Sequence, residues 1–383
     1  MPNAIRTQTF TESVIRGMTR LAQAHGAINL AQGFPDFPMP EEMKAAAIDA
    51  INKDINQYAI TWGAKKLRDA IVGKYQRRYG MAVDPEREIT IACGATEATA
   101  SVFLALFNPG DEVLIFEPFY ENYGPDAILC EAKPVYVPLV PPKWEFDPDR
   151  LKKAITPKAR ALVLNSPHNP TGHVFSRAEM EAIAKICIEH DLLVLTDDPY
   201  EYIIYDGEHI PIATLPGMRE RTITISSLSK TFSITGWRLG YAIASPERTD
   251  AIRKVHDFLT VGAPAPLQQA AAIGYSFGED YYAKMTAEYR ERRDFLGAAL
   301  RRAGFAFADP QGAYYLFADI TPLTKLDDVP YAEWLTREIG IATVPGSSFY
   351  RPNAPEGKRY TRFAFCKKMS TLEQAVERLK KLA

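Results

Sequence analysis

Short apolar runs that alternate with helical patterns constrain the fold of this chain more than any other feature. The runs span residues 112–116, 161–164, 192–196, 222–225 and 241–244, and helical spacing is seen between them, as in Arg177–His190. Parallel strands are joined by helical crossovers and covered on both faces, so they contain continuous apolar runs. The sequence therefore predicts an α/β fold with a parallel or mostly parallel sheet between helices.

Further elements are predicted on either side of these runs. A helix begins after Pro40 with acidic residues in its first turn, and a second helix covers residues 64–79. Residues 89–91 indicate a short strand that leads into a turn and a helix at residues 93–96. Strands are expected around residues 313–319 and 360–365, followed by a last helix over residues 371–382.

The character of the sequence changes after the Pro-containing segment 262–266. Residues 267–304 show a long helical pattern with few interruptions and dense charge at 288–294. We therefore expect a domain boundary near residue 280. It separates a large domain over residues 41–280 from a smaller α+β domain over residues 281–383, on which an N-terminal segment, residues 1–40, packs.

Composition excludes several classes of protein. The 383 residues can bury one or two cores, and a formal net charge of -2 with dispersed basic residues does not favour nucleic-acid binding. The apolar runs fall short of the ~18 residues that a membrane span needs. The cysteines, at positions 93, 130, 187 and 366, lie far apart, which argues against a metal site and a disulfide framework. Since Met1–Arg6 lacks the apolar region of a secretory signal, we expect a soluble cytoplasmic protein.

The segment from Ser226 to Gly240 contains the most informative side chain, Lys230. A lysine is usually a solvated surface residue, and Lys230 alone would be interpreted in that way. Ser227 and Arg238, however, supply donors suited to a phosphate group, and the apolar residues between them indicate partial burial. A buried lysine near other cations has a lowered pKa and becomes nucleophilic. The segment therefore favours a nucleophilic lysine beside a phosphate site.

Arg362 lies in the otherwise apolar strand expected at residues 360–365. An unpaired buried charge is costly, so this guanidinium requires an anion. From the residues alone, an anionic ligand and an internal salt bridge explain the arginine equally well.

Several motifs together resemble the class I pyridoxal-phosphate aminotransferases of fold type I. The family signature Ser-x-x-Lys followed by Gly-x-Arg corresponds to Ser227, Lys230, Gly236 and Arg238. Further matches are the Asn-Pro-Thr-Gly turn within residues 165–172, the Asp-x-x-Tyr motif at 197–200, and two segments similar to the kynurenine, glutamine and methionine branch, 29–37 and 56–58. The resemblance covers nearly the whole chain. It implies a large domain with a mostly parallel seven-stranded sheet between helices and a smaller α+β domain.

The resemblance also implies that the protein binds pyridoxal 5'-phosphate, with Lys230 holding the cofactor as a Schiff base. Asp197 would face the pyridine nitrogen and keep it protonated. Asn169 and Tyr200 would donate hydrogen bonds to the phenolic oxygen, and Tyr120 would stack on the ring. The residues implied at the phosphate group are Ala95, Thr96, Ser227 and Arg238. Without the resemblance, Asp197 and Thr96 would be interpreted as ordinary caps.

Other residues gain a role from the same resemblance. Arg362 is expected to bind the substrate α-carboxylate beside Asn169, with Gly33 allowing close approach of the backbone. Tyr58 is similar to the tyrosine that reaches the phosphate site of a neighbouring subunit, so we expect a homodimer; otherwise such a loop tyrosine is surface or interface packing. The peptides Glu117–Pro118 and Asn169–Pro170 match positions at which the family tends to have cis bonds.

The function implied by the resemblance is a ping-pong transfer of an amino group from an L-amino acid to a 2-oxo acid, with Lys230 moving a proton at the substrate α-carbon. Two aromatic cage positions of the mammalian kynurenine aminotransferases correspond to Ile15 and Val261, which predicts a roomier pocket. Residues 258–266 contain no cation for a second carboxylate. We therefore expect neutral or aromatic donors, such as methionine, glutamine, phenylalanine or kynurenine, rather than aspartate.

Alternatives remain open at this point. A carbon–sulfur β-lyase uses the same lysine to expel a β-substituent, and an aspartate-type aminotransferase needs only a cation from a distant segment, for instance Arg16 or Arg20. A cofactor-binding regulator would need a DNA-binding domain, and no basic helix-turn-helix pattern is present before Pro40. We expect small-molecule partners and no nucleic acid, membrane or metal partner.

Overall fold

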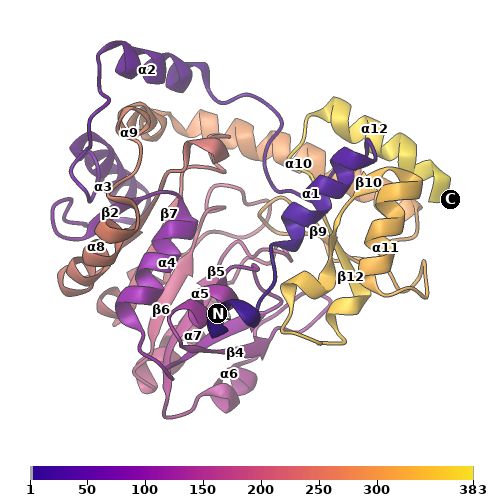
Figure 1. The fold of residues 1–383 in the computed structure, drawn as a ribbon, viewed down its shortest axis with the longest axis horizontal. Helices are drawn as coiled ribbons and strands as arrows, with labels where there is room; N and C mark the ends of the chain where they lie inside the picture. Colours follow the sequence, from indigo (N-terminus) through magenta and orange to yellow (C-terminus); the bar gives the residue numbers. More distant parts are fainter. Residues whose placement is uncertain (1–2, 383) are drawn as a thin grey trace.

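The computed structural model describes residues 3–382, and its largest element is a seven-stranded sheet (Figure 1). The strands are β2 (Ile89–Ala92), β3 (Glu112–Glu117), β4 (Lys133–Pro138), β5 (Ala159–Asn165), β6 (Leu193–Asp197), β7 (Thr222–Ser227) and β8 (Gly240–Ile243). Their order in the sheet is β2-β8-β7-β6-β5-β3-β4. β8 is antiparallel to β2 and β7, whereas the other neighbours pair in parallel. The expected mostly parallel sheet is confirmed.

Helices cover both faces of this sheet. They are α3 (Lys65–Tyr79), α4 (Ala95–Leu106), α5 (Tyr123–Leu129), α6 (Pro148–Ala154), α7 (Arg177–Glu189), α8 (Pro246–Thr260) and α9 (Ala265–Ala271), and α2 (Glu41–Asn52) packs against α9. Consecutive strand residues point to opposite faces. Val113 and Ile115 of β3 therefore belong to a core with α4, α5 and α8, while Leu114 and Phe116 belong to a core with α6 and α7. Burial on both faces explains the continuous apolar runs of the sequence.

A smaller group of strands lies beside the large sheet, at the right of Figure 1. β9 (Tyr315–Asp319), β11 (Val344–Pro345) and β12 (Tyr360–Ala364) form an antiparallel sheet, accompanied by α10 (Glu279–Arg302), α11 (Asp328–Trp334) and α12 (Met369–Leu379). The N-terminal segment contributes β1 (Ile28–Asn29), which pairs in parallel with β10 (Ile341–Ala342), and α1 (Val14–Ala24), which packs against β10 and β11. The domain limits at residues 40 and 280 stay predictions.

The helical pattern over residues 267–304 is less continuous in the structure than the sequence suggests. α9 ends at Ala271, a 3-10 helix covers Ala272–Ser276, and α10 begins only at Glu279. Gly278 caps α10, and two acidic side chains occupy its first turn, where they interact favourably with the helix dipole. No helix within residues 3–382 is both long and apolar enough to cross a membrane.

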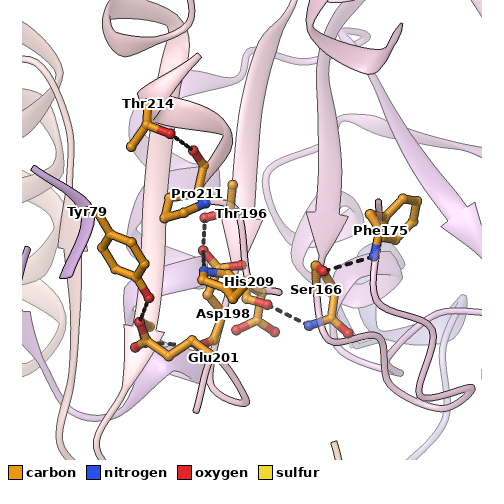
Figure 2. Close-up of polar contacts among 12 residues, drawn as sticks. Tyr79, Ser166, Phe175, Thr196, Asp198, Glu201, His209, Pro211 and Thr214 are labelled. Carbon is orange, nitrogen blue, oxygen red and sulfur yellow. Dashed lines mark hydrogen bonds and ion pairs between the residues drawn. The ribbon is translucent and has the colours of Figure 1, made fainter. Parts of the chain in front are cut away.

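A buried polar network surrounds Asp198, the residue that follows β6 (Figure 2). Nζ of Lys74 lies 2.5 Å from Oε1 of Glu201, and these side chains are only 2% and 3% exposed. Tyr79 donates a hydrogen bond to the other oxygen of Glu201 at 2.8 Å. Asp198 accepts a hydrogen bond from Thr196 at 2.7 Å. Figure 2 shows the part of the network around Asp198 and Glu201. An ion pair this deeply buried is stable only while both partners are present.

Removing Lys74 should therefore destabilise the fold. In Lys74→Met the buried carboxylate of Glu201 loses its cation, and breaking a buried pair in this way costs about 3–5 kcal/mol. We expect the free energy of unfolding, measured in urea, to fall by that amount. The matched control is Lys53→Met, because Lys53 pairs with Asp49 on the surface, where an ion pair contributes about 0–1 kcal/mol. Equal effects of the two substitutions would contradict the prediction.

Candidate active site

A cavity of about 1030 Å³ opens at the carboxyl ends of the central strands. Asp197 ends β6, Ser227 ends β7, and both line the cavity together with the first residues of α4. This edge of a parallel sheet is where α/β folds bind ligands. The cavity brings together most of the residues singled out in the sequence: Gly33, Ala95, Thr96, Tyr120, Asn169, Asp197, Tyr200, Ser227, Lys230, Arg238 and Arg362.

Lys230 follows β7 and projects into this cavity. Its Nζ donates a hydrogen bond to the carbonyl oxygen of Gly33 at 3.1 Å. Burial lowers the pKa of Lys230 to about 8, and the positive charges of Arg238 and Arg362 act in the same direction. A substantial fraction of this amine is therefore unprotonated at mildly basic pH, and an unprotonated amine attacks carbonyl carbons.

Asp197 presents an unpartnered carboxylate oxygen to the cavity. Its Oδ2 accepts a hydrogen bond from the hydroxyl of Tyr123 at 2.6 Å, while Oδ1 is buried without a partner among the described residues. Burial raises the pKa of Asp197 to about 6, against the opposing effect of the Tyr123 hydrogen bond. Asp198 belongs instead to the network of Figure 2. Oδ1 of Asp197 therefore needs a hydrogen-bond donor.

Arg362 on β12 is 1% exposed and touches two other segments of the chain. Its Nη1 donates a hydrogen bond to Oδ1 of Asn169 at 2.7 Å, and its Nη2 donates one to the carbonyl oxygen of Ala31 at 2.9 Å. Nε is buried without a partner in the described part of the chain. Since none of the ion pairs within residues 3–382 includes this guanidinium, an internal salt bridge does not explain it. An anionic ligand would satisfy the remaining donor, Nε.

Gly33 permits close contact between the N-terminal loop and β9. A Cβ atom at this position would lie 2.1 Å from the hydroxyl oxygen of Tyr315. That hydroxyl lies 2.9 Å from the hydroxyl of Tyr200. Tyr314 donates a hydrogen bond to the Gly33 carbonyl at 2.8 Å. Any larger residue would displace Tyr315 from the wall of the cavity.

The N-terminus of α4 and Arg238 form a cationic corner of the cavity. Gly94 precedes α4 with a φ of 82°, and a Cβ atom there would lie 2.3 Å from Nη2 of Arg238. Arg238 donates hydrogen bonds to the carbonyl oxygens of Thr235 at 3.1 Å and Cys93 at 3.3 Å. Within residues 3–382, no side chain caps the first N–H groups of α4. Free N–H groups at a helix N-terminus beside a guanidinium suit a phosphate group.

Two expected residues lie outside this cavity. Tyr58 is 84% exposed and Val261 is 42% exposed, whereas Ile15 does line the cavity. An exposed tyrosine is compatible with contact to a second chain, so the role of Tyr58 stays a prediction. The cis peptides expected at Glu117–Pro118 and Asn169–Pro170 are confirmed.

Other residues of the cavity carry no recognisable signal in the sequence. The hydroxyl of Tyr315 contacts that of Tyr200, and the centre of the Tyr315 ring lies 4.1 Å from the guanidinium carbon of Arg362. The strand that contains Tyr315, β9, matches no motif. Tyr123 and Asp126 of α5 also line the cavity. In the sequence, only their spacing of three residues indicates that the two side chains lie on one helix face.

Comparison with known proteins identifies the family. The family model of class I and II aminotransferases matches residues 25–379. A probable N-succinyldiaminopimelate aminotransferase of Mycobacterium tuberculosis is 42% identical over 99% of this chain and 98% of its own length. A solved structure of N-succinyldiaminopimelate aminotransferase from that organism covers 100% of both chains at 41% identity, with a TM-score of 0.97.

Relatives with other names match almost as completely. The methionine aminotransferase of Escherichia coli is 36% identical over 97% of this chain and 96% of its own length. Human kynurenine–oxoglutarate transaminase 1 is 35% identical over 94% of each chain. The chain therefore belongs to the class I and II aminotransferases, and it is a pyridoxal-phosphate-dependent aminotransferase of fold type I.

Proposed function

We propose that this aminotransferase takes the amino group from an L-amino acid with a large neutral or aromatic side chain and passes it to a 2-oxo acid. The observation that carries the proposal is the distribution of positive charge. Among the described residues, the cations that line the cavity are Arg16, Lys230, Arg238 and Arg362. The last three serve the cofactor and the α-carboxylate in our assignment, and Arg16 is exposed. The relatives reported above are named aminotransferases, which gives the β-lyase alternative no support.

The residues of the cavity fit pyridoxal phosphate. The buried, unpartnered Oδ1 of Asp197 requires a donor, and a protonated pyridine nitrogen is one. The N-terminus of α4 and Arg238 suit the phosphate group, and the lowered pKa of Lys230 suits a bond to the aldehyde. In our assignment Ala95, Thr96 and Ser227 join the phosphate site, Tyr120 covers the ring, and Asn169 and Tyr200 bind the phenolic oxygen.

The chain's own residues orient the donor and move its proton. When bound, pyridoxal phosphate supplies an electron sink for the charge left at the donor α-carbon and carries the amino group between the half-reactions. Arg362 binds the α-carboxylate, and its hydrogen bonds to Asn169 and Ala31 fix its orientation. Lys230, once released by the donor amine, takes the proton from the α-carbon. Asp197 holds a proton at the ring nitrogen.

A second candidate donor carries a distal carboxylate. Arg16 lines the cavity and makes no ion pair within residues 3–382, whereas the neighbouring Arg20 pairs with Glu12 at 2.8 Å. A relative that is 42% identical is named for N-succinyldiaminopimelate, a long amino acid with distal carboxylates. In this alternative Arg16 binds the distal group, and the cavity of about 1030 Å³ accommodates the long side chain.

We further propose a cytoplasmic homodimer in which Tyr58 reaches the phosphate site of the neighbouring subunit. Tyr58 is 84% exposed and Phe258 is 92% exposed, and exposed large apolar side chains mark interaction surfaces. Nε2 of His256 in α8 lies 2.8 Å from the carbonyl oxygen of Thr61. The segments that contain Tyr58 and Phe258 are therefore neighbours. The free cysteines fit a reducing compartment.

The two adjacent aspartates provide a test of the cofactor assignment. Asp197→Asn should lower kcat/KM for methionine by about 10³-fold or more, because an amide does not stabilise positive charge at the ring nitrogen. Asp198→Asn is the matched control and should lose less than about tenfold, since Asp198 lies in the buried polar network of Figure 2. A larger loss in Asp198→Asn than in Asp197→Asn would show that the wrong carboxylate has been assigned.

Shared active sites should allow two defective variants to rescue each other. Tyr58→Ala and Lys230→Ala should each be nearly inactive at limiting pyridoxal phosphate. After unfolding and refolding together, half of the dimers are mixed, and each mixed dimer contains one site with both residues intact. We expect about a quarter of the wild-type activity to return. No recovery in a mixture shown by sedimentation to contain dimers would rule out the role of Tyr58.

The donor preference is best measured in the first half-reaction alone, where no acceptor interferes. Single-turnover changes in cofactor absorbance would be followed with methionine, glutamine, phenylalanine, kynurenine, aspartate and N-succinyldiaminopimelate. We expect the neutral donors to exceed aspartate by about 100-fold or more, because a distal carboxylate buried without a partner is costly.

Arg16→Gln separates the two candidate functions in the same assay. It should leave the neutral donors unchanged. If N-succinyldiaminopimelate is instead the best donor and Arg16→Gln slows it by about tenfold or more, the second candidate is correct. Aspartate as the fastest donor would contradict both.

A further inference from the structure

Asp126 is a buried carboxylic acid of the cavity that has no role in the mechanism above. It lies on α5, is 7% exposed and lines the cavity. Its Oδ2 is buried without a hydrogen-bond partner, and none of the ion pairs within residues 3–382 includes it. A buried carboxyl group without a partner is destabilising unless a proton or a bound group compensates its charge.

The carboxyl group of Asp126 lies on the helix face of α5 that contacts Asp197. Tyr123 and Asp126 are three residues apart and therefore lie on one face of the helix. The hydroxyl of Tyr123 donates a hydrogen bond to Oδ2 of Asp197 at 2.6 Å, which places that face beside the end of β6. Oδ1 of Asp197 and Oδ2 of Asp126 are both buried and unpartnered. Both carboxyl groups thus line the same cavity, and Tyr123 on the face of α5 that carries Asp126 contacts Asp197 directly.

The surroundings of Asp126 contain acids and hydroxyl groups. Among the described residues, no cation forms an ion pair with Asp126. Burial raises the pKa of Asp126 to about 7, and the charge of Asp197 adds to the increase. Burial also raises the pKa values of the neighbouring tyrosines, so their hydroxyl groups stay protonated. The titratable groups of the adjoining elements include Tyr120, Glu121, Tyr123 and Cys130 of the α5 region, Tyr136 of β4 and Asp197 of β6.

We propose that Asp126 is a second acidic group at the pyridine end of the cofactor site, where its negative charge strengthens the binding of a ring-protonated cofactor. The inference rests on the proposed assignment of Asp197 to the ring nitrogen. Two neighbouring buried carboxyl groups do not both ionise readily, so the pair retains a proton near neutral pH before the cofactor binds. The positive charge of the ring favours ionisation of Asp126, and the displaced proton passes to the solvent.

This coupling makes the contribution of Asp126 depend on pH. At about pH 5.5 the group is protonated with or without the cofactor, so it adds no charge. At about pH 8.5 it is ionised in both states and attracts the protonated ring. Its contribution to cofactor affinity therefore grows as the pH rises through about 7. A purely structural residue would contribute equally at both pH values.

The test compares the affinity of full-length apoenzyme for pyridoxal phosphate in the wild type and in Asp126→Asn. The amide keeps the shape of the side chain and removes its charge. Dissociation constants would be measured by equilibrium dialysis between about pH 5.5 and 8.5. The ratio of variant to wild-type constants should be near one at the low end and rise to about tenfold at the high end. Effects of pH on the bond to Lys230 cancel in this ratio.

Three further variants make the outcome decisive. Asp126→Val should give the same dependence on pH, because the proposal depends on charge and not on shape, and it replaces Asp126→Asn if that variant does not fold. Asp149→Asn removes an exposed charge from α6 and should leave the ratio near one at every pH. A ratio for the folded Asp126 variants that does not change with pH overturns the inference. Asp197→Asn should weaken binding throughout; if it does not, the assignment of Asp197 has failed instead.

Discussion

The buried guanidinium of Arg362 joins three segments of the candidate active site. It comes from β12, donates a hydrogen bond to Ala31 of the N-terminal segment, and donates another to Asn169 in the turn after β5. An arginine is charged at every accessible pH, so removing it from water is costly unless its donors are satisfied. Nε has no partner within the described residues, and a substrate carboxylate would satisfy it. The Arg362 guanidinium therefore both holds these segments together and suits an anionic substrate. The packing of the three segments and the binding of the substrate depend on the same group.

Burial shifts the pKa values of Lys230 and Asp197 in opposite directions. It lowers the pKa of Lys230 to about 8 and raises that of Asp197 to about 6, because a low-dielectric environment disfavours the charged form of either group. Both values move toward neutral pH, where proton transfer is easiest. Desolvation in a cavity at the end of a parallel sheet thus shifts the pKa values of both the Lys230 amine and the Asp197 carboxyl group.

The sequence was sufficient for features whose signal is local. Apolar runs fixed the type of sheet, and Lys230, Asp197 and Arg238 lie in motifs where a strand ends or a turn begins. Tyr315 could not be predicted, because its importance arises only when β9 pairs with β12 and brings it beneath Arg362. The choice between a salt bridge and a ligand for Arg362 likewise depended on which distant side chains surround it. In residues 267–304, the 3-10 helix Ala272–Ser276 and the glycine that caps α10 separate two helices within a helical composition.

The end of β6 serves function on one side and stability on the other. Asp197 faces the cavity, whereas Asp198 belongs to the buried network that includes Lys74 and Glu201. Ser226 links this network to β7, since its hydroxyl donates to the carbonyl oxygen of Asp198 and to Glu201, each at 3.1 Å. The residue after Ser226 already lines the cavity. The unpartnered groups of the cavity cost free energy until a ligand satisfies them. The buried network around Asp198 supplies hydrogen bonds that hold the same strand ends in place, so these strand ends do not depend on the ligand alone for their positions.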